Sequence, residues 1–312
     1  MRPAETSLVT VKVLLGILCL AVFAGCAATP DEGKKPGVAD VPKVSDDKKN
    51  EQEARLLKDI YHLLEKGKTS DASALLSQLA RLNPTNPELR LAQAEIFLRQ
   101  GLFPEAASLF SELVTKKQLL ARSHQGVGLV RLQLGQTASA KTQFEKAVAL
   151  DDQLWRSWNG LGYYYDSKKQ WGKAEESYNR ALKLRRDKPA LYNNRGFSKL
   201  MQGRYEDAIA DFKTALKLDP GVKVARMNIR LAQAWLGRYV EAIAGASKRE
   251  LPLVLNNVGY IAMLKGELAT AEAYFSRSME LSPSFNETAS NNLQKLEAIK
   301  LQSGPRGKAR KR

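Results

Sequence analysis

The chain has 312 residues, of which 44% are hydrophobic and 26% are charged, a composition typical of folded globular proteins. Lys and Arg outnumber Asp and Glu by 49 to 33, which gives a formal net charge of +16 at pH 7. This charge favours acidic partners such as anionic lipid, cell-wall polymer, nucleic acid or acidic protein. Both cysteines, Cys19 and Cys26, lie close to the N-terminus, so the rest of the sequence offers no thiol for a disulfide.

The N-terminus has the pattern of an export signal. Arg2 and Lys12 precede an apolar run at 13–24, VLLGILCLAVFA, which is too short to span a bilayer. A basic start, a short apolar core and small residues at the cleavage site are typical of a secretory signal. We therefore predict a signal peptide over residues 1–25.

The end of this signal, Phe23-Ala24-Gly25-Cys26, resembles a bacterial lipobox. The resemblance implies cleavage before Cys26, diacylation of its thiol and acylation of the new amino group, which anchors the protein in the membrane. Two acyl chains hold a protein stably on a membrane, whereas one chain does not. Ala27 after the cysteine, in place of Asp, implies an outer-membrane lipoprotein that faces the periplasm. A plain secretory signal or an uncleaved helix is the alternative.

Residues 26–52 are expected to form a flexible tether between the lipid and the folded body. The segment contains three prolines and two glycines among Asp and Lys, with almost no apolar side chains. It cannot bury enough apolar surface to offset the conformational entropy lost on folding.

From residue 53 the sequence repeats with a period of 34. WNGLGYYYDSKKQWGKAEESYNRALKL, which starts at Trp158, aligns with YNNRGFSKLMQGRYEDAIADFKTALKL, which starts at Tyr192. A fixed period of this length, with small and aromatic residues at constant positions, indicates stacked helix–turn–helix repeats. The pattern resembles the tetratricopeptide repeat (TPR), in which each repeat is a pair of helices, A and B. The first five repeats begin near Glu53, Pro87, Ala121, Trp155 and Pro189.

Each of these repeats has a small residue where helix B opens and a bulky residue four positions later. The small residue lets two helix axes approach, and the bulky one fills the space beside it. The pairs are Ala72 and Leu76, Ala106 and Phe110, Ala140 and Phe144, Ala174 and Tyr178, and Ala208 and Phe212.

The sixth repeat, from Lys223, departs from this pattern. Ala246 stands in place of the bulky residue, and we expect Glu250-Leu251-Pro252 to end helix B early. A seventh repeat follows, and residues 286–302 are predicted to be the helix that caps the array. The expected fold is all-α: a right-handed superhelical TPR solenoid of about seven helix pairs over 53–285, plus the capping helix. Residues 303–312 are expected to be a disordered basic tail.

No motif for catalysis or for a metal is found. His62 and His124, the only histidines, belong to predicted helices, and no Cys/His/carboxylate group has metal-ligand spacing. Gly-x-Gly pairs at 126–128 and 160–162 fall inside helix A with no strand before them, so they do not indicate a nucleotide site. We expect a binding protein without enzymatic activity, cofactor or metal.

In TPR proteins, positions 2, 5, 9 and 12 of helix A face the concave groove. The resemblance therefore implies a groove that carries asparagines and aromatic residues. An amide both donates and accepts, so it can pair with the backbone of an extended peptide, and aromatic rings add rigid apolar area. The alternative is that these asparagines only cap or solvate the helix face. The candidate groove residues are Asn159, Tyr163, Asn193, Asn194, Phe197, Asn256, Asn257 and Tyr260.

The segment at 226–266 resembles the TadD family, TPR lipoproteins of tight-adherence (Flp) pilus assembly. That family has a degenerate repeat of the form N-L-A-x-x-x-G-R-x-x-E-A, followed by N-N-x-x-Y. Two features depart from that family. Ile229-Arg230 stands where an apolar pair is usual, and the long basic tail is an addition. The matching residues are Asn228, Leu231, Ala232, Gly237, Arg238, Glu241, Ala242, Asn256, Asn257 and Tyr260.

This resemblance implies a pilotin-like or scaffolding role for an outer-membrane lipoprotein, with subunits of a pilus or secretin assembly as partners. The alternative is a TPR lipoprotein adaptor that recruits envelope hydrolases or proteases. Nucleic acid fits the positive charge, but an exported lipoprotein rarely meets it. The sequence leaves the oligomeric state open.

Overall fold

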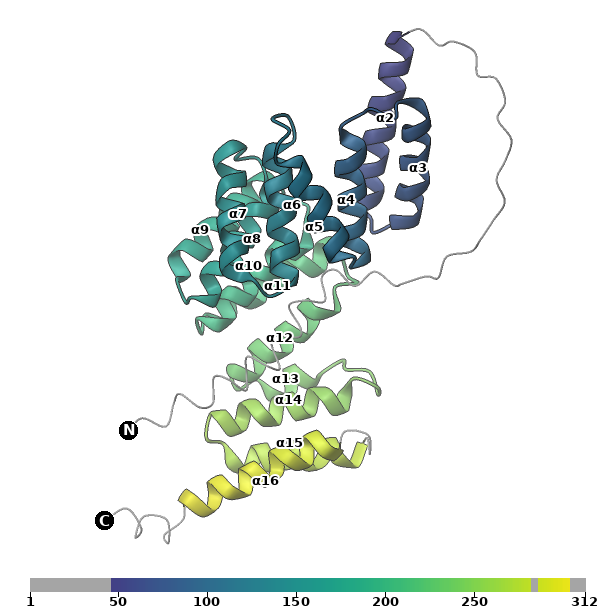
Figure 1. Cartoon of the computed structure of the whole chain (residues 1–312). Helices are drawn as coiled ribbons and strands as arrows, with labels where there is room; N and C mark the ends of the chain where they lie inside the picture. The colour runs from purple at the N-terminus through teal and green to yellow at the C-terminus, as the bar shows by residue number, and fades with distance from the viewer. Residues whose placement is uncertain (1–45, 282–285, 304–312) are drawn as a thin grey trace. The chain divides into compact units, whose positions relative to one another are not determined.

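The computed structural model describes residues 46–281 and 286–303 (Figure 1). All regular structure in these ranges is helical, from α2 to α16. The helices form two compact units, which meet in the sequence between Arg185 and Arg186 and are described separately below. The predicted signal peptide, Cys26 and the basic tail from residue 304 lie outside the described residues.

The first unit contains four pairs of helices, A and B. Each helix A packs on its own helix B and on helix A of the next pair, so the helices A form an inner layer and the helices B an outer one. The pairs are α2 (Asp46–Glu65) with α3 (Thr69–Leu82), α4 (Glu88–Gln100) with α5 (Phe103–Leu113), α6 (Leu120–Gln133) with α7 (Thr137–Leu150), and α8 (Trp155–Ser167) with α9 (Trp171–Leu184).

The second unit contains three further pairs and a final helix. Leu296 of that helix is fully buried against Ala262 and Phe275, so the helix covers the last pair as predicted. The seven pairs and this cap confirm the expected fold class. The pairs are α10 (Pro189–Met201) with α11 (Tyr205–Leu218), α12 (Lys223–Trp235) with α13 (Tyr239–Ile243), and α14 (Leu251–Leu264) with α15 (Leu268–Leu281), followed by α16 (Asn286–Ser303).

Helix α2 begins at Asp46, before the predicted repeat start at Glu53. The last part of the expected tether, 46–52, is therefore helical. Its Lys, Glu and Gln residues have good helix propensity, and Asp47 in the first turn interacts favourably with the helix dipole. Polar composition alone did not distinguish a solvated helix turn from a linker.

The predicted bulky residues form the core of both units, and several of them pack on a glycine of helix A. Phe144 and Tyr178 are buried, and a Cβ added to Gly160 would lie 2.2 Å from the Phe144 ring. On Gly162 the added Cβ would lie 2.6 Å from Tyr178. The Gly-x-Gly pair at 160–162 is thus explained by close packing of aromatic rings on the helix backbone.

Helix B of the sixth repeat is shorter than the sequence predicts. Helix α13 ends at Ile243, because Ala244 takes an extended ψ of 138° and Gly245 a left-handed φ of +64°. The expectation that Glu250-Leu251-Pro252 ends helix B is wrong: Leu251 and Pro252 begin α14 instead. Proline fits there because the N–H that it lacks would have no partner within the helix.

Arg230 compensates for this truncation. It stands at the repeat position that Gly162 holds in the fourth repeat, where the sixth repeat has no aromatic ring to accommodate. Its side chain is buried, and Nη1 donates to the carbonyl oxygens of Ala242 at 2.6 Å and Ala244 at 2.9 Å. These carbonyls at the end of α13 would otherwise lack partners. The departure at Ile229-Arg230 is therefore the counterpart of the short helix.

Candidate protein-binding surfaces

Two of the predicted groove asparagines are buried between helices. Asn193 and Asn256 are 0% and 2% exposed. Asn228 Nδ2 donates to Asn193 Oδ1 at 3.2 Å, and Asn292 Nδ2 donates to Asn256 Oδ1 at 3.0 Å. The prediction that these two amides meet a peptide does not fit the structure. Position 5 lies where one helix A packs on the next, so the amides join α10 to α12 and α14 to α16.

The other four groove candidates of the second unit keep part of their surface exposed. Asn194, Phe197, Asn257 and Tyr260 are half-buried. Asn194 accepts a hydrogen bond of 3.4 Å from the neighbouring Asn193, and Asn257 Nδ2 lies 3.8 Å from the Met227 sulfur. Partly exposed aromatic rings and amides thus remain on the inner helices α10 and α14.

The remaining two candidates belong to the first unit. Asn159 is half-buried and Tyr163 is 38% exposed, both on α8. Helix α8 belongs to the inner layer of that unit, whose charged side chains the sequence prediction did not include.

That inner layer carries a chain of charged pairs, which starts at α2, α4 and α6. Arg122 Nη1 donates to both carboxylate oxygens of Glu88, at 2.7 and 2.8 Å. The Tyr61 hydroxyl donates to the same carboxylate at 2.9 Å, and the Arg122 guanidinium lies 4.7 Å from the centre of the Tyr61 ring. Burial raises the pKa of Tyr61 far above its usual value, so the hydroxyl stays protonated and remains a donor.

The series of charged pairs continues at Glu95 of α4. Arg156 Nη1 donates to Glu95 at 2.9 Å, and these side chains are only 17% and 10% exposed. Burial acts to raise the pKa of Glu95, but the positive charges of Arg156 and Arg99 outweigh it and hold the pKa below its ordinary value. Glu95 is therefore ionised at neutral pH.

A third pair connects the first repeat to the fourth. Arg185 Nη1 and Nη2 donate to the two carboxylate oxygens of Glu65 at 3.0 and 3.3 Å. The guanidinium groups of Arg185 and Arg156 lie 5.8 and 5.7 Å from the Trp155 ring. Side chains from repeats 1, 2 and 4 thus converge within one unit.

A sequence signal for this network existed. Glu88, Arg122 and Arg156 stand 34 residues apart, at the second position of consecutive repeats. An acid followed by a base at one inner position predicts an ion pair between neighbouring helices A. The groove prediction, which rests on asparagines and aromatic residues, does not include this pair.

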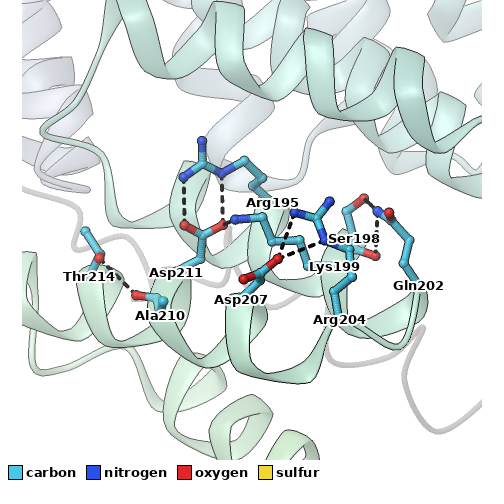
Figure 2. A network of polar contacts seen from close by, with 9 residues as sticks. All are labelled: Arg195, Ser198, Lys199, Gln202, Arg204, Asp207, Ala210, Asp211 and Thr214. Carbon is cyan, nitrogen blue, oxygen red and sulfur yellow. Dashed lines mark hydrogen bonds and ion pairs between the residues drawn. The ribbon is translucent and has the colours of Figure 1, made fainter.

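The second unit has a charged network of a different kind, inside one repeat (Figure 2). Asp211 of α11 is nearly fully buried and accepts from Arg195 Nε and Nη2 at 2.8 and 2.7 Å. Lys199 Nζ lies 2.8 Å from the same carboxylate. Arg195 and Lys199 both belong to α10, so this network joins helix A to helix B of the fifth repeat. Its carboxylate is fully engaged by the two cations.

One histidine contact joins two helices of the first unit. His124 Nδ1 lies 2.7 Å from the Gln143 side-chain oxygen, a contact between α6 and α7. In the described ranges no group of three or more His, Cys, Asp or Glu is arranged to hold a metal ion. No described helix is both long enough and apolar enough to cross a bilayer.

The tetratricopeptide-repeat family matches most of the helical array. Matches to the family models cover residues 59–119 and 128–189, 189–222, and 253–285, which together exceed half of the chain. The chain is a TPR protein. TPR proteins bind protein partners through their helix arrays, and the exposed inner-layer side chains described above are its candidate contacts.

Several solved structures are similar to this chain. A chain in the crystal structure of the APC/C hetero-tetramer Cut9-Hcn1 has 18% sequence identity and a TM-score of 0.57; the alignment covers 76% of this TPR protein and 48% of that chain. This protein therefore spans about half the length of that relative. TTC0263 of Thermus thermophilus has 22% identity, coverage of 61% and 98%, and a TM-score of 0.48. The PilF structure of Pseudomonas aeruginosa has 16% identity, coverage of 79% and 99%, and a TM-score of 0.46. No curated protein matches the sequence.

Proposed function

We propose that this TPR protein is a lipid-anchored, pilotin-like scaffold that assists assembly of a Flp/Tad-type pilus or secretion machine. It binds an extended segment of a machine subunit on its inner helices. The observation that carries the proposal is the sequence at 226–266, where the TadD pattern coincides with the short helix α13.

The proposed cellular location rests on the N-terminal sequence. The lipobox-like ending at Cys26 supports a diacylated anchor, and Ala27 supports sorting to the outer membrane with the body in the periplasm. Replacement of Cys26 by Ser should abolish metabolic labelling with palmitate and release the protein from the membrane fraction. Labelling that persists in this variant would contradict the anchor.

The proposed binding surface uses the exposed inner side chains of the second unit. Phe197 and Tyr260 offer partly exposed rings on α10 and α14, and Asn194 and Asn257 place amides beside them. Aromatic side chains supply much of the binding energy at protein interfaces, and amides pair with a peptide backbone regardless of its sequence.

Affinity purification from the native cell tests this surface. The double variant Phe197→Ala/Tyr260→Ala should lose the co-purifying pilus or secretin subunits. The matched control is Leu218→Ala/Val240→Ala, which removes two exposed apolar side chains from helices B. Circular dichroism establishes that both variants are folded. Equal recovery of partners with both variants would refute the proposed surface.

The same experiment addresses the alternative from the sequence, an adaptor for envelope enzymes. Recovery of cell-wall hydrolases or proteases in place of pilus subunits would favour the adaptor. Secretin, ATPase and prepilin genes beside the gene for this protein would favour pilus assembly.

A further inference from the structure

We infer that the turn between α8 and α9 of the first unit is a docking surface for the anionic headgroups of a lipid bilayer. The inference rests on the proposed function only in taking the protein to reach a membrane. Its test uses a chain without the lipid anchor at Cys26, so the anchor and the docking surface can fail separately. The surface is named here the lysine–tyrosine surface. It comprises Lys141 of α7, Tyr164 and Tyr165 of α8, Lys168 and Lys169 of the turn, and Lys173 of α9.

Lys169 holds a backbone conformation that glycine holds in the other repeats. The turn between helices A and B has a glycine with φ between +73° and +83° in six repeats, whereas Lys169 takes a φ of +56° in the fourth. It is the one non-glycine residue with a positive φ in the described ranges. A side chain in this region is strained, because its Cβ approaches the following carbonyl oxygen. The six glycines are Gly67, Gly101, Gly135, Gly203, Gly237 and Gly266.

This strain is not compensated by a contact within the protein. The Lys169 side chain is exposed, and in the described ranges it makes no hydrogen bond, ion pair or ring contact. Packing therefore does not explain why this turn carries a lysine in place of a glycine. A strained residue whose side chain has no partner in the fold points to a role outside the fold. For an exposed ammonium group, that role is contact with an anion.

Three more lysines surround the two tyrosine rings beside this turn. Lys141 Nζ and Lys168 Nζ each lie 5.9 Å from the centre of the Tyr164 ring. Lys173 Nζ lies 5.6 Å from the centre of the Tyr165 ring. These lysines come from α7, the turn and α9, which pack around α8 in the first unit (Figure 1). The packing of three neighbouring helices thus gathers cations that the sequence separates.

Few acids balance these cations. Glu145 pairs with Lys141 at 2.8 Å, and Asp166 accepts a hydrogen bond of 2.8 Å from the buried Tyr178 hydroxyl. The other three lysines of the lysine–tyrosine surface make no ion pair in the part of the chain that the structure describes. The first turn of α9 contains no acid, so the positive end of its dipole adds to their charge. Like charges held together repel, and an anionic surface would relieve that repulsion.

The aromatic rings of the lysine–tyrosine surface fit the boundary layer of a bilayer. Tyr164 and Tyr165 are half-buried, with ring centres 5.5 Å apart, and the half-buried Trp171 follows the turn directly. Neither tyrosine hydroxyl makes a hydrogen bond within the described ranges. Tyr and Trp gather at membrane interfaces, where the ring meets the apolar layer and the polar atom meets water, and lysine stems cover apolar surface beside them. Lysines together with such rings favour a lipid surface over a partner recognised by charge alone.

Vesicle flotation measures the docking. The mature chain from residue 26 carries Cys26→Ser, so it keeps every described helix and cannot be acylated. It is mixed with vesicles of phosphatidylcholine, or with vesicles of phosphatidylcholine and phosphatidylglycerol in equal parts. The chain should float with the anionic vesicles only, and high salt should release it because salt screens the contact. No binding to the anionic vesicles would overturn the inference.

Matched charge variants separate this surface from the overall positive charge. Lys168→Gln/Lys169→Gln should weaken binding to the anionic vesicles at least tenfold, because each lysine near an anionic surface contributes about fivefold. The control Lys213→Gln/Lys217→Gln removes the same charge from exposed positions of α11 in the second unit and should weaken binding less than about threefold. The basic tail is unchanged in both variants. Equal losses would show that binding follows net charge alone and would contradict the surface.

A fluorescent label reports which end of α8 meets the bilayer. The mature chain with Cys26→Ser contains no other cysteine, so Gln170→Cys gives one labelling position in the turn. The matched control Gln153→Cys lies before α8, at the opposite end of that helix, and both positions are exposed. A polarity-sensitive label at 170 should brighten on vesicle binding, and the same label at 153 should not. Equal responses at the two positions would refute docking through the turn.

Lys169→Gly separates docking from folding. Glycine takes a positive φ without strain, so this variant should keep or raise the thermal midpoint and still weaken vesicle binding about fivefold. A lysine retained for the fold would instead give a lower midpoint and unchanged binding. Binding equal to that of the parent chain would overturn the role of Lys169.

The same variants test other classes of partner. Poly-glutamate and single-stranded DNA carry negative charge without an apolar layer. If either binds the parent chain in a manner that Lys168→Gln/Lys169→Gln abolishes, while the anionic vesicles do not bind, the partner is an acidic polymer and the lipid inference is wrong. Palmitate labelling at Cys26 and partner recovery by Phe197→Ala/Tyr260→Ala are separate readouts, so failure of one claim leaves the others testable.

Discussion

The two units join their inner helices by different chemistry. In the first unit, consecutive helices A are joined by Glu88–Arg122, and Glu95 of α4 reaches Arg156 of α8. In the second unit the corresponding layer is joined by the amide pairs Asn193–Asn228 and Asn256–Asn292. The repeat frame of alanine, glycine and bulky residues is common to both. Repeats with the same packing residues can therefore be joined to one another either by ion pairs or by amide pairs.

The difference has an energetic consequence. A buried charge needs its partner, because an uncompensated charge in a low-dielectric environment is far more costly than an unpaired amide. The first unit should therefore be more sensitive than the second to loss of one member of an inner pair. The following predictions test that contrast.

Glu95→Ala should have the largest effect. It leaves Arg156 and Arg99 close together without the carboxylate between them, and we expect a loss of about 3–5 kcal/mol, as for other broken buried ion pairs. Denaturant unfolding with hydrogen exchange on the first-unit helices measures it. Glu105→Ala, an exposed glutamate at the start of α5, is the control and should cost less than about 1 kcal/mol. Equal losses would remove the basis of the contrast.

Arg230→Ala should come next, with a loss of about 2–3 kcal/mol confined to the second unit. The variant leaves the carbonyls of Ala242 and Ala244 without their charged donor. Thermal unfolding and exchange rates in α12 and α13 report the change. Lys223→Ala, an exposed cation on the same helix, should be nearly neutral. A neutral Arg230→Ala would show that the short helix does not depend on this contact.

Asn193→Ala should cost about 1–2 kcal/mol, since it leaves the Asn228 amide buried without its acceptor. Asn291→Ala on α16 removes the same side chain at an exposed position and is the matched control. A role of Asn193 in the groove, as expected from the sequence, would instead make its loss affect binding and spare the fold. A stable Asn193→Ala variant that fails to bind partners would support the groove role of Asn193.

Acid should produce the smallest effect. The folded pKa of Glu95 lies below its unfolded value of about 4.3, so its contribution is present at neutral pH and is lost as pH falls through the folded pKa. We expect the first unit to lose stability as the pH falls below about 4. Glu95→Gln should flatten this part of the stability profile. An unchanged profile would argue against an ionised Glu95.

The parts of the fold that follow from local pattern were predictable. Ala174 and Tyr178 recur at a constant period, and such short-range spacing reports helix pairs directly. The end of α13 was not predictable in this way, since it depends on Arg230 reaching back from α12. Burial of Asn193 depends on contact with α12, and Glu65 and Arg185 lie 120 residues apart in sequence. These features require the packing of one repeat on another, which single-repeat patterns do not contain.

The exchange at Arg230 and Ala246 also limits how the array can change by mutation. Most repeats combine a glycine on helix A with an aromatic ring on helix B, whereas the sixth combines an arginine with an alanine. Restoring only the ring would set it against a long side chain, and restoring only the glycine would leave helix-end carbonyls unpaired. We expect each single step to be destabilising, so conversion of one kind of repeat into the other would need both changes together. In recombination or in design, the sixth repeat should therefore be exchanged as one unit, with Arg230 and Ala246 kept together.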